Sequence, residues 1–263
     1  MPNWNSNYLT VKGFTPAEQS EFKEKVEAEE LFTYYHPIPE ELEYSVNVVE
    51  SIDAQRKEVE GKDWWSERTE EQREEYLARF KERKSLQYLI DKYGEVDGYN
   101  WCIKNWGTKW DMGDPVIGSE DSEFTCYFST AWSPPVAAFE EISKRFPNAT
   151  FELSYEEQGS DFTGAARFKS GVVEEFDGLP PSELKDNWLQ ENHPELVGNE
   201  DREDEVWELW SDAYKEVVEN HLAELLGSEP LSADVIQARK ESEEQAKELF
   251  ERMLQDLKAK QTT

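Results

Sequence analysis

The sequence of 263 residues has few of the features that several functional classes require. Its 28 Lys and Arg residues face 59 Asp and Glu residues, which gives a formal net charge of −31. Phosphate backbones and anionic lipids both bind to basic surfaces, so we expect no direct binding to nucleic acid and none to a membrane. No run approaches the ~18 apolar residues of a membrane-spanning helix. The first residues do not have the pattern of a signal peptide, so a cytoplasmic location is expected.

Cysteine and histidine are scarce as well. Cys102 and Cys126 are too few for a disulfide framework, and we expect both to be reduced residues of the core. The three histidines lie in separate segments and none neighbours a cysteine, so the spacing predicts no metal site. Glycine-rich phosphate-binding loops and the Gly-x-Ser-x-Gly turn are absent. The sequence therefore predicts no enzyme activity, no catalytic residue, no metal and no cofactor.

Aromatic residues, in contrast, are abundant. The chain has 10 Trp, 11 Tyr and 13 Phe, although its mean hydropathy is only −0.87. Each aromatic side chain buries roughly 150–250 Å² when it is covered. We therefore expect a folded protein with an aromatic core and a heavily charged surface.

Local patterns predict the order of the helices and strands. Thr15 followed by Pro16 and Glu18 has the hydroxyl, proline and carboxylate of a capped helix start, and Thr69 with Gln72 is a second capping pair. Alternating and helical hydrophobic periods predict the remaining elements. The predicted strands are 6–12, 114–118, 123–131, 150–155, 164–169 and 172–176. The predicted helices include 16–30, 69–80, 85–93, 99–106, 136–146, 203–226 and 232–258.

This order predicts an α+β protein. Without a helical insertion at about 40–85, it matches the β-α-β-β-α-β arrangement of ferredoxin-like proteins. We therefore expect residues 1–178 to form an antiparallel sheet with helices on one face, carrying that insertion. Residues 179–263 are predicted to be an acidic helical extension.

Four blocks of sequence resemble the YubB-type ferredoxin-like family, which is found on phages and conjugative plasmids. They are the start of the chain from Met1 to Val11, the block YNWCIKNWGTKWD at 99–111, the block TAWSPP at 130–135, and Tyr155-Glu156-Glu157 followed by Gly159 and Phe162. The resemblance extends over about 1–35 and 85–178, and the C-terminal third has no counterpart. The family pattern has Cys where this chain has Asn5, which argues against a thiol function there. The resemblance implies the fold and a mobile-element origin, and it implies no activity.

The second and third of these blocks also contain a candidate binding pocket. Two indoles could frame a ligand while a lysine contacts its phosphate or carboxylate, and a further tryptophan could close the site. The alternative is that these tryptophans belong to the core. The candidate residues are Trp106, Lys109, Trp110 and Trp132.

The acidic residues are concentrated near the C-terminus. Residues 174–226 have 17 acidic and three basic residues, a net charge of −14 out of −31. Ten acids in 200–224, over ~37 Å of helix, give one charge per ~3.7 Å, against ~3.4 Å for one DNA strand and ~1.7 Å for the duplex. Glu208, Asp212, Glu216 and Glu219 are spaced to share one solvent-facing stripe. The predicted partner-binding residues are Glu203, Asp204, Glu205, Glu208, Asp212, Glu216 and Glu219.

These features together predict a phage- or plasmid-type accessory protein that acts in the host cytoplasm by binding another protein. Its partner would be the basic surface of a host DNA-acting or defence protein, inhibited by partial mimicry of DNA. One alternative is a ligand-binding or enzymatic domain at the Trp/Lys pocket. Another is an oligomeric interaction module, such as a homodimer, in which Leu249, Phe250, Met253 and Leu257 pair between chains.

Overall fold

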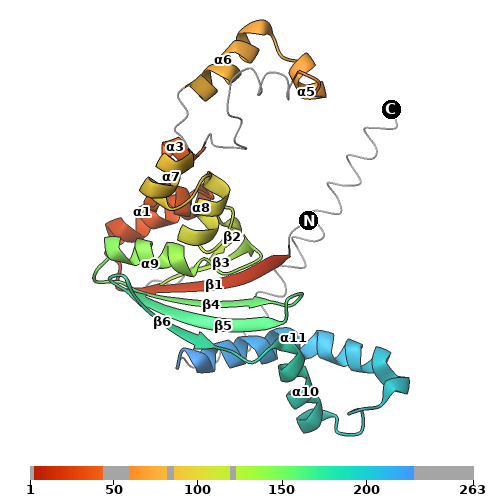
Figure 1. Cartoon of the computed structure of the whole chain (residues 1–263). Coiled ribbons are helices and arrows are strands. Elements are labelled where there is room, and N and C mark those ends of the chain that lie inside the picture. The colour runs from red at the N-terminus through yellow and green to blue at the C-terminus, as the bar shows by residue number, and fades with distance from the viewer. Residues whose placement is uncertain (1–2, 44–59, 82–85, 119–122, 228–263) are drawn as a thin grey trace, which may run out of the picture. The chain divides into compact units, whose positions relative to one another are not determined.

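The structure is a computed structural model that describes residues 3–43, 60–81, 86–118 and 123–227 (Figure 1). The chain divides into two compact units. The first unit is Met1–Ser160 with Ala166–Glu175, and the second is Asp161–Ala165 with Phe176–Thr263. The helix predicted at 232–258 and its four proposed pairing residues lie outside the described residues.

A six-stranded sheet forms the centre of the α+β fold, in the order β2-β3-β1-β4-β5-β6. β1 lies between β3 and β4 and is antiparallel to both, and β2 is antiparallel to β3. The segment from β1 to β4 contains the β-α-β-β-α-β order of the ferredoxin-like fold, as predicted. The strands are β1 (Trp4–Lys12), β2 (Gly113–Ile117), β3 (Glu123–Ala131), β4 (Thr150–Glu157), β5 (Phe162–Lys169) and β6 (Val172–Asp177).

Two helices, α1 (Pro16–Glu27) and α9 (Val136–Arg145), cover one face of β1–β4 with aromatic side chains (Figure 1). Every second residue of β1 from Asn5 to Val11 is buried, because successive side chains point to opposite faces. From α1, Phe22 packs 5.2 Å from the ring of Phe124 on β3. From α9, Phe139 lies 6.1 Å from Phe151 on β4. The core of the first unit is therefore the aromatic layer between this face and the two helices.

Both predicted capping pairs are confirmed. The Thr15 hydroxyl accepts from the Glu18 N–H at 3.3 Å, while Glu18 Oε2 accepts from the Thr15 N–H at 2.7 Å. Thr69 and Gln72 make the same reciprocal pair at the start of the helix Glu70–Lys81. Each pair satisfies donors that the first turn of a helix otherwise leaves free.

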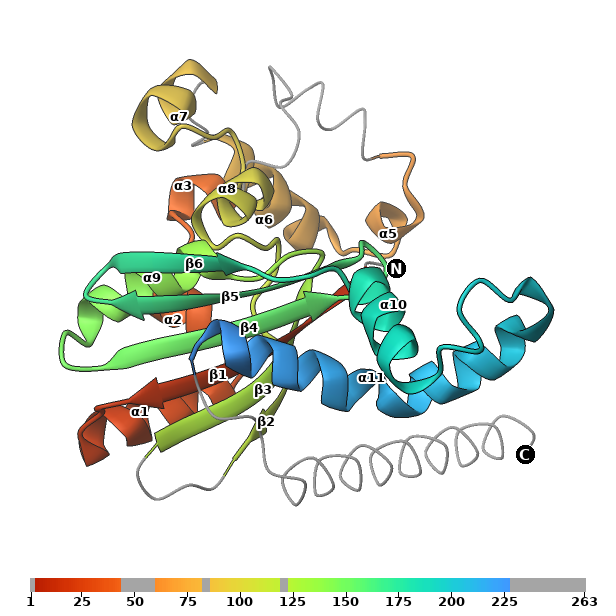
Figure 2. The ribbon, with the colours of Figure 1, turned by 90° about the horizontal axis from the view of Figure 1, so that it is seen from below.

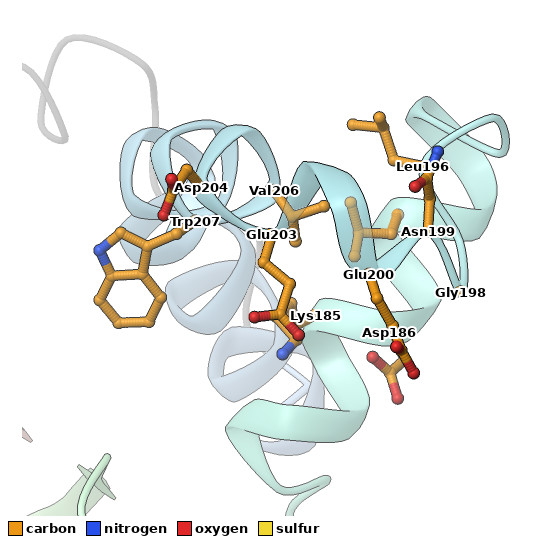
Figure 3. A pocket seen from close by; sticks show the side chains of 11 residues that line it. Lys185, Asp186, Leu196, Gly198, Asn199, Glu200, Glu203, Asp204, Val206 and Trp207 are labelled. Atoms are coloured by element: carbon orange, nitrogen blue, oxygen red, sulfur yellow. The ribbon is translucent and has the colours of Figure 1, made fainter.

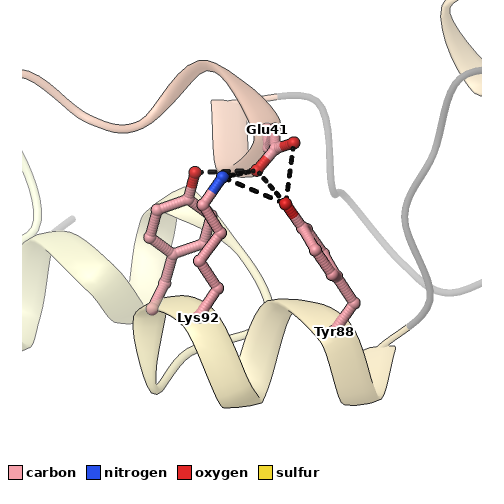
Figure 4. Close-up of polar contacts among 4 residues, drawn as sticks. Glu41, Tyr88 and Lys92 are labelled. Carbon is pink, nitrogen blue, oxygen red and sulfur yellow. Dashed lines mark hydrogen bonds and ion pairs between the residues drawn. The ribbon is translucent and has the colours of Figure 1, made fainter.

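The segment between α1 and β2 is helical over a longer stretch than predicted. It contains α2 (Leu31–Tyr35), α3 (Glu40–Glu43), α5 (Asp63–Ser66), α6 (Glu70–Lys81), α7 (Leu86–Tyr93) and α8 (Gly98–Asn105). Glu41 links α3 to α7, since its carboxylate accepts from Lys92 Nζ at 2.8 Å and from the Tyr93 hydroxyl at 2.7 Å (Figure 4). Tyr88 donates to the same carboxylate at 3.4 Å. Glu41 therefore serves as an anchor for α7.

The second unit contains α10 (Pro181–Asn192), the short 3-10 helix η1 (Glu200–Arg202) and α11 (Glu203–Leu225) (Figure 2). Leu184 of α10 is buried with Trp210, Val218 and Leu222 of α11. α10 lies within the predicted helical extension, but no separate helix is predicted at 181–192, because Pro180 and Pro181 indicate a break. Pro181 instead occupies the first position of the helix, where no N–H is needed. Among the described helices, none combines the length and apolarity needed to cross a membrane.

The aromatic layer makes a quantitative prediction. Replacing Phe22 with Ala removes a fully buried ring, so we expect a loss of about 3–5 kcal/mol in the free energy of unfolding. Ile103→Ala, at a residue that is 44% exposed, is the control and should cost less than about 0.5 kcal/mol. Urea unfolding of the two variants measures both values. Equal losses would contradict the placement of Phe22 at the centre of the core.

Candidate functional site

Trp106, the first residue of the predicted pocket, lies in the core. It is 2% exposed, its indole Nε1 donates to the His36 carbonyl at 2.8 Å, and its backbone N–H ends α8 by donating to Cys102. Its ring packs 5.8 Å from Phe32 and 6.0 Å from Trp101. The prediction that Trp106 lines a pocket is therefore wrong, because this side chain is buried in the core while other residues of the same block are exposed.

The other three predicted residues come together with Trp4 on the surface of the first unit. Lys109 Nζ lies 4.2 Å from the ring centre of Trp110 and 5.7 Å from that of Trp132, and the Trp4 and Trp110 rings are 6.2 Å apart. Trp4 is 52% exposed, Trp110 is 48% exposed and Trp132 is 47% exposed. We name this cluster of Trp4, Lys109, Trp110 and Trp132 the tryptophan patch. Trp4 was missed, although its position out of phase with the buried residues of β1 is a signal for exposure.

Two loops hold the patch in place. Gly107 has φ +85°, and a Cβ there would lie 2.7 Å from the Pro134 carbonyl oxygen, so the close approach of the loops requires glycine. The Ser133 hydroxyl donates to the Gly107 carbonyl at 2.5 Å, and the Thr108 hydroxyl donates to the Ala131 carbonyl at 3.1 Å. These bonds join the loop that presents Lys109 and Trp110 to the loop that presents Trp132.

A buried amide network supports the same loops from beneath. The Asn5 amide donates to Asn7 Oδ1 at 2.8 Å, and the Asn7 amide donates to the Thr130 hydroxyl at 2.9 Å. Thr130 in turn donates to the Ser133 carbonyl at 2.8 Å. Both asparagines are fully buried, and Asn5 Oδ1 has no hydrogen-bond partner among the described residues. At the end of the sheet next to the patch, the buried side chains are therefore polar.

The two thiols are unsuited to nucleophilic chemistry. Cys102 and Cys126 are free and buried, as predicted for core residues. Burial raises the pKa of each thiol to about 12, so the thiolate form is suppressed at neutral pH. In the part of the chain that the structure describes, no three His, Cys, Asp or Glu side chains converge as metal ligands.

The predicted acidic stripe on α11 is only partly exposed. Glu203, Asp204, Glu208, Asp212 and Glu216 are exposed as predicted. Glu205 is exposed too, but Arg202 pairs with its carboxylate, with the Arg202 Nε 2.6 Å from Glu205 Oε2. Glu219 is 8% exposed, which corrects its assignment to the solvent-facing stripe. Spacing determines which residues share a helix face, but it does not determine how much of the helix surface other segments cover. Around Val218 and Leu222, more of the surface of α11 is buried.

A pocket of about 410 Å³ lies beside the first turns of α11 (Figure 3). Leu189, Leu196 and Val206 supply its apolar lining, and Trp207, 65% exposed, stands at its rim. Its charged lining residues are Lys185, Asp186, Glu200, Glu203 and Asp204. The volume is within the range of small-ligand and side-chain pockets. Trp207 was missed because it lies off the apolar stripe of α11, and its position among acidic residues is the signal that could have revealed it.

His221, on the half-buried side of α11, forms a hydrogen bond within the second unit. Its Nε2 accepts from the Leu179 N–H at 2.8 Å, which requires the neutral ring. Burial lowers its pKa below the ordinary value of 6.5. The bond ties α11 to the segment before α10.

A family model supports the ferredoxin-like assignment for part of the chain. A family model described as the ferredoxin-like domain in Api92-like protein matches residues 105–193, which run from the end of α8 to the end of α10. The crystal structure of protein api92 from Yersinia pseudotuberculosis aligns with a TM-score of 0.37 at 9% identity, covering 68% of this chain and 100% of that one. A similarity this low supports no conclusion about fold or function. No curated protein matches the chain. The YubB-type assignment stays a prediction.

The backbone at Trp132 makes a stability prediction. Trp132 has φ +74°, a left-handed conformation that costs a side chain about 1–2 kcal/mol. Both Trp132→Gly and Trp132→Ala remove the ring, but only Gly adopts this conformation freely. We expect the Gly variant to be the more stable by roughly 0.5–1 kcal/mol in urea unfolding. At Tyr99, an exposed residue of α8, the order should reverse because Gly weakens a helix. The same order at both positions would contradict strain at Trp132.

The His221 bond predicts a pH dependence. A folded-state pKa below 6.5 means that the unfolded chain binds the proton more tightly. The stabilisation from neutral His221 is therefore complete above that value and is lost as the pH falls toward the folded-state pKa. His221→Gln keeps an acceptor that does not titrate. Between about pH 7.5 and about pH 5.5 the wild type should lose more stability than this variant, measured by urea unfolding. Parallel pH profiles would show that His221 is not the titrating group.

Proposed function

We propose that the chain acts by binding a protein, and that the exposed face at the start of α11 is the docking surface for a basic partner. The observation that carries this proposal is Trp207, a 65% exposed indole set among acidic residues beside a pocket. Tryptophan is enriched at the energetic centres of protein interfaces. An exposed indole with exposed acidic neighbours along the helix, such as Asp204 and Glu208, suits an arginine or lysine side chain, which can make a cation–π contact with the ring and an ion pair with a carboxylate.

The charge of this region supports a basic partner. Residues 174–226 have a net charge of −14, and Lys185 is the only cationic residue among those that line the described pocket. Such a field accelerates encounter with a surface of opposite charge. The DNA-binding face of a host DNA-acting or defence protein has this chemistry. Action against it as a phage- or plasmid-type accessory protein is the specific form of the proposal.

Electrostatic docking is better supported than close mimicry of DNA. Glu219 is buried and Glu205 is paired to Arg202, so eight of the ten acids in 200–224 are exposed and form no ion pair among the described residues. Over the same ~37 Å, this leaves one charge per ~4.6 Å, against ~3.4 Å in one DNA strand. We therefore infer recognition through an anchor residue and a general field, and not through matched phosphate positions.

The test is capture of partners from host lysate on the immobilised full-length chain. At about 50 mM salt we expect a basic protein to be retained, and at about 500 mM salt we expect it to be released. Duplex DNA added as a competitor should also release it, because the partner's DNA-binding face is the one in use. Retention that is insensitive to salt, or partners that are not basic, would overturn the proposal.

Matched charge variants locate the surface. Changing Glu208, Asp212 and Glu216 to their amides should weaken the captured interaction about tenfold at low salt and much less at high salt. Changing the exposed Glu67, Glu71 and Glu74 of the helical insertion to Gln removes the same charge elsewhere. Titration by calorimetry compares the two. Equal losses would show that net charge alone, and not the α11 face, determines binding.

A further inference from the structure

We propose that the tryptophan patch is a second docking surface, and that it binds a short peptide segment presenting one carboxylate beside apolar side chains. The patch belongs to the first unit, whereas the α11 face belongs to the second. The two surfaces also require partners of opposite charge. This inference therefore does not rest on the proposed function.

The apolar part of the patch is large enough to drive binding. Trp4, Trp110 and Trp132 are each about half exposed. With roughly 150–250 Å² available per aromatic side chain, their open area is on the order of 300 Å². Contiguous apolar areas of this size on a soluble protein commonly mark interaction sites, and tryptophan dominates the energetics of such contacts.

Lys109 determines the charge of the ligand. Its ammonium lies over the rings of Trp110 and Trp132, so the site where these rings would take a cation is already occupied by the chain itself. No described carboxylate forms an ion pair with Lys109, although the chain has 59 acidic residues. Its three N–H donors suit a carboxylate from outside the chain.

Size and net charge select a short peptide over larger ligands. A stable complex between two folded proteins buries about 800 Å² on each side, well above the area of the patch. A second copy of this chain would also meet the repulsion between two charges of −31. A nucleic acid strand, with a charge on every nucleotide, meets the same repulsion. A segment with a single acidic residue can pair with Lys109 and meets the least electrostatic repulsion from the net negative charge of the chain.

The loops of the patch are joined by hydrogen bonds without any ligand. Hydrogen bonds from Ser133 and Thr108 join its loops, and Trp132 is kept in a left-handed conformation. Strain of this kind persists where the surrounding structure enforces it, and it is concentrated at functional sites. A preorganised surface loses little conformational entropy on binding, so a short peptide is sufficient.

The test is selection of peptides from a ribosome-displayed library of random dodecapeptides on the full-length chain. We expect enriched peptides that contain one Asp or Glu next to Leu, Phe or Trp. For the best of these, changing its acid to the amide should weaken binding about tenfold, as should Lys109→Met in the protein. Lys109→Arg should restore binding, because it keeps the charge over the rings.

Matched tryptophan variants separate this surface from the α11 face. Trp110→Ala should abolish binding of the selected peptide, whereas Trp207→Ala should leave it unchanged and weaken only the basic partner. Thermal unfolding should show that both variants stay folded, since both residues are exposed. Selected peptides without an acid, or peptides whose binding does not depend on Lys109 and Trp110, would overturn the inference. Either result leaves the test of the basic partner unaffected.

Discussion

The structure depends on burying one layer of aromatic side chains in a chain with a low content of apolar residues. Only 37% of the residues are hydrophobic, and the net charge opposes compaction. The first unit meets this constraint by packing Phe22 and Phe139 against the phenylalanines of one sheet face. Concentrating the rings there leaves the charged residues at the surface, where water solvates them. The ferredoxin-like order suits this arrangement because both of its helices cover the same face.

The same sheet explains why the tryptophan patch is exposed. β1 alternates, so its inward positions at the polar end are the asparagines 5 and 7, and Trp4 lies out of phase with them. The amide network stabilises the loops through Thr130 and Ser133. Three indoles, of a kind that is usually buried in a core, are therefore exposed at the end of the sheet. Lys109 over two of them gives this surface a positive centre in an acidic protein.

The two units therefore offer different chemistry to partners. In the second unit, Trp207 lies in an acidic stretch of α11, which a cationic side chain would complement. In the first unit, Lys109 lies over two indole rings, and a carboxylate would complement it. A chain with both surfaces is suited to contacting two unlike partners. In both proposals tryptophan would supply the apolar contact, and the neighbouring charge would determine which partner is accepted.

The sequence by itself determined the elements whose signals are local. The capping pairs at Thr15 and Thr69, the alternation of β1 and the ferredoxin-like order all follow from interactions within a few residues. Tertiary structure decided which residues of a pattern are exposed. Trp106 is buried while Trp110 is open, and Glu219 is covered while Glu216 is not, although spacing treats each pair alike. The physical reason is that periodicity defines a face, whereas exposure depends on what distant segments of the chain pack against it.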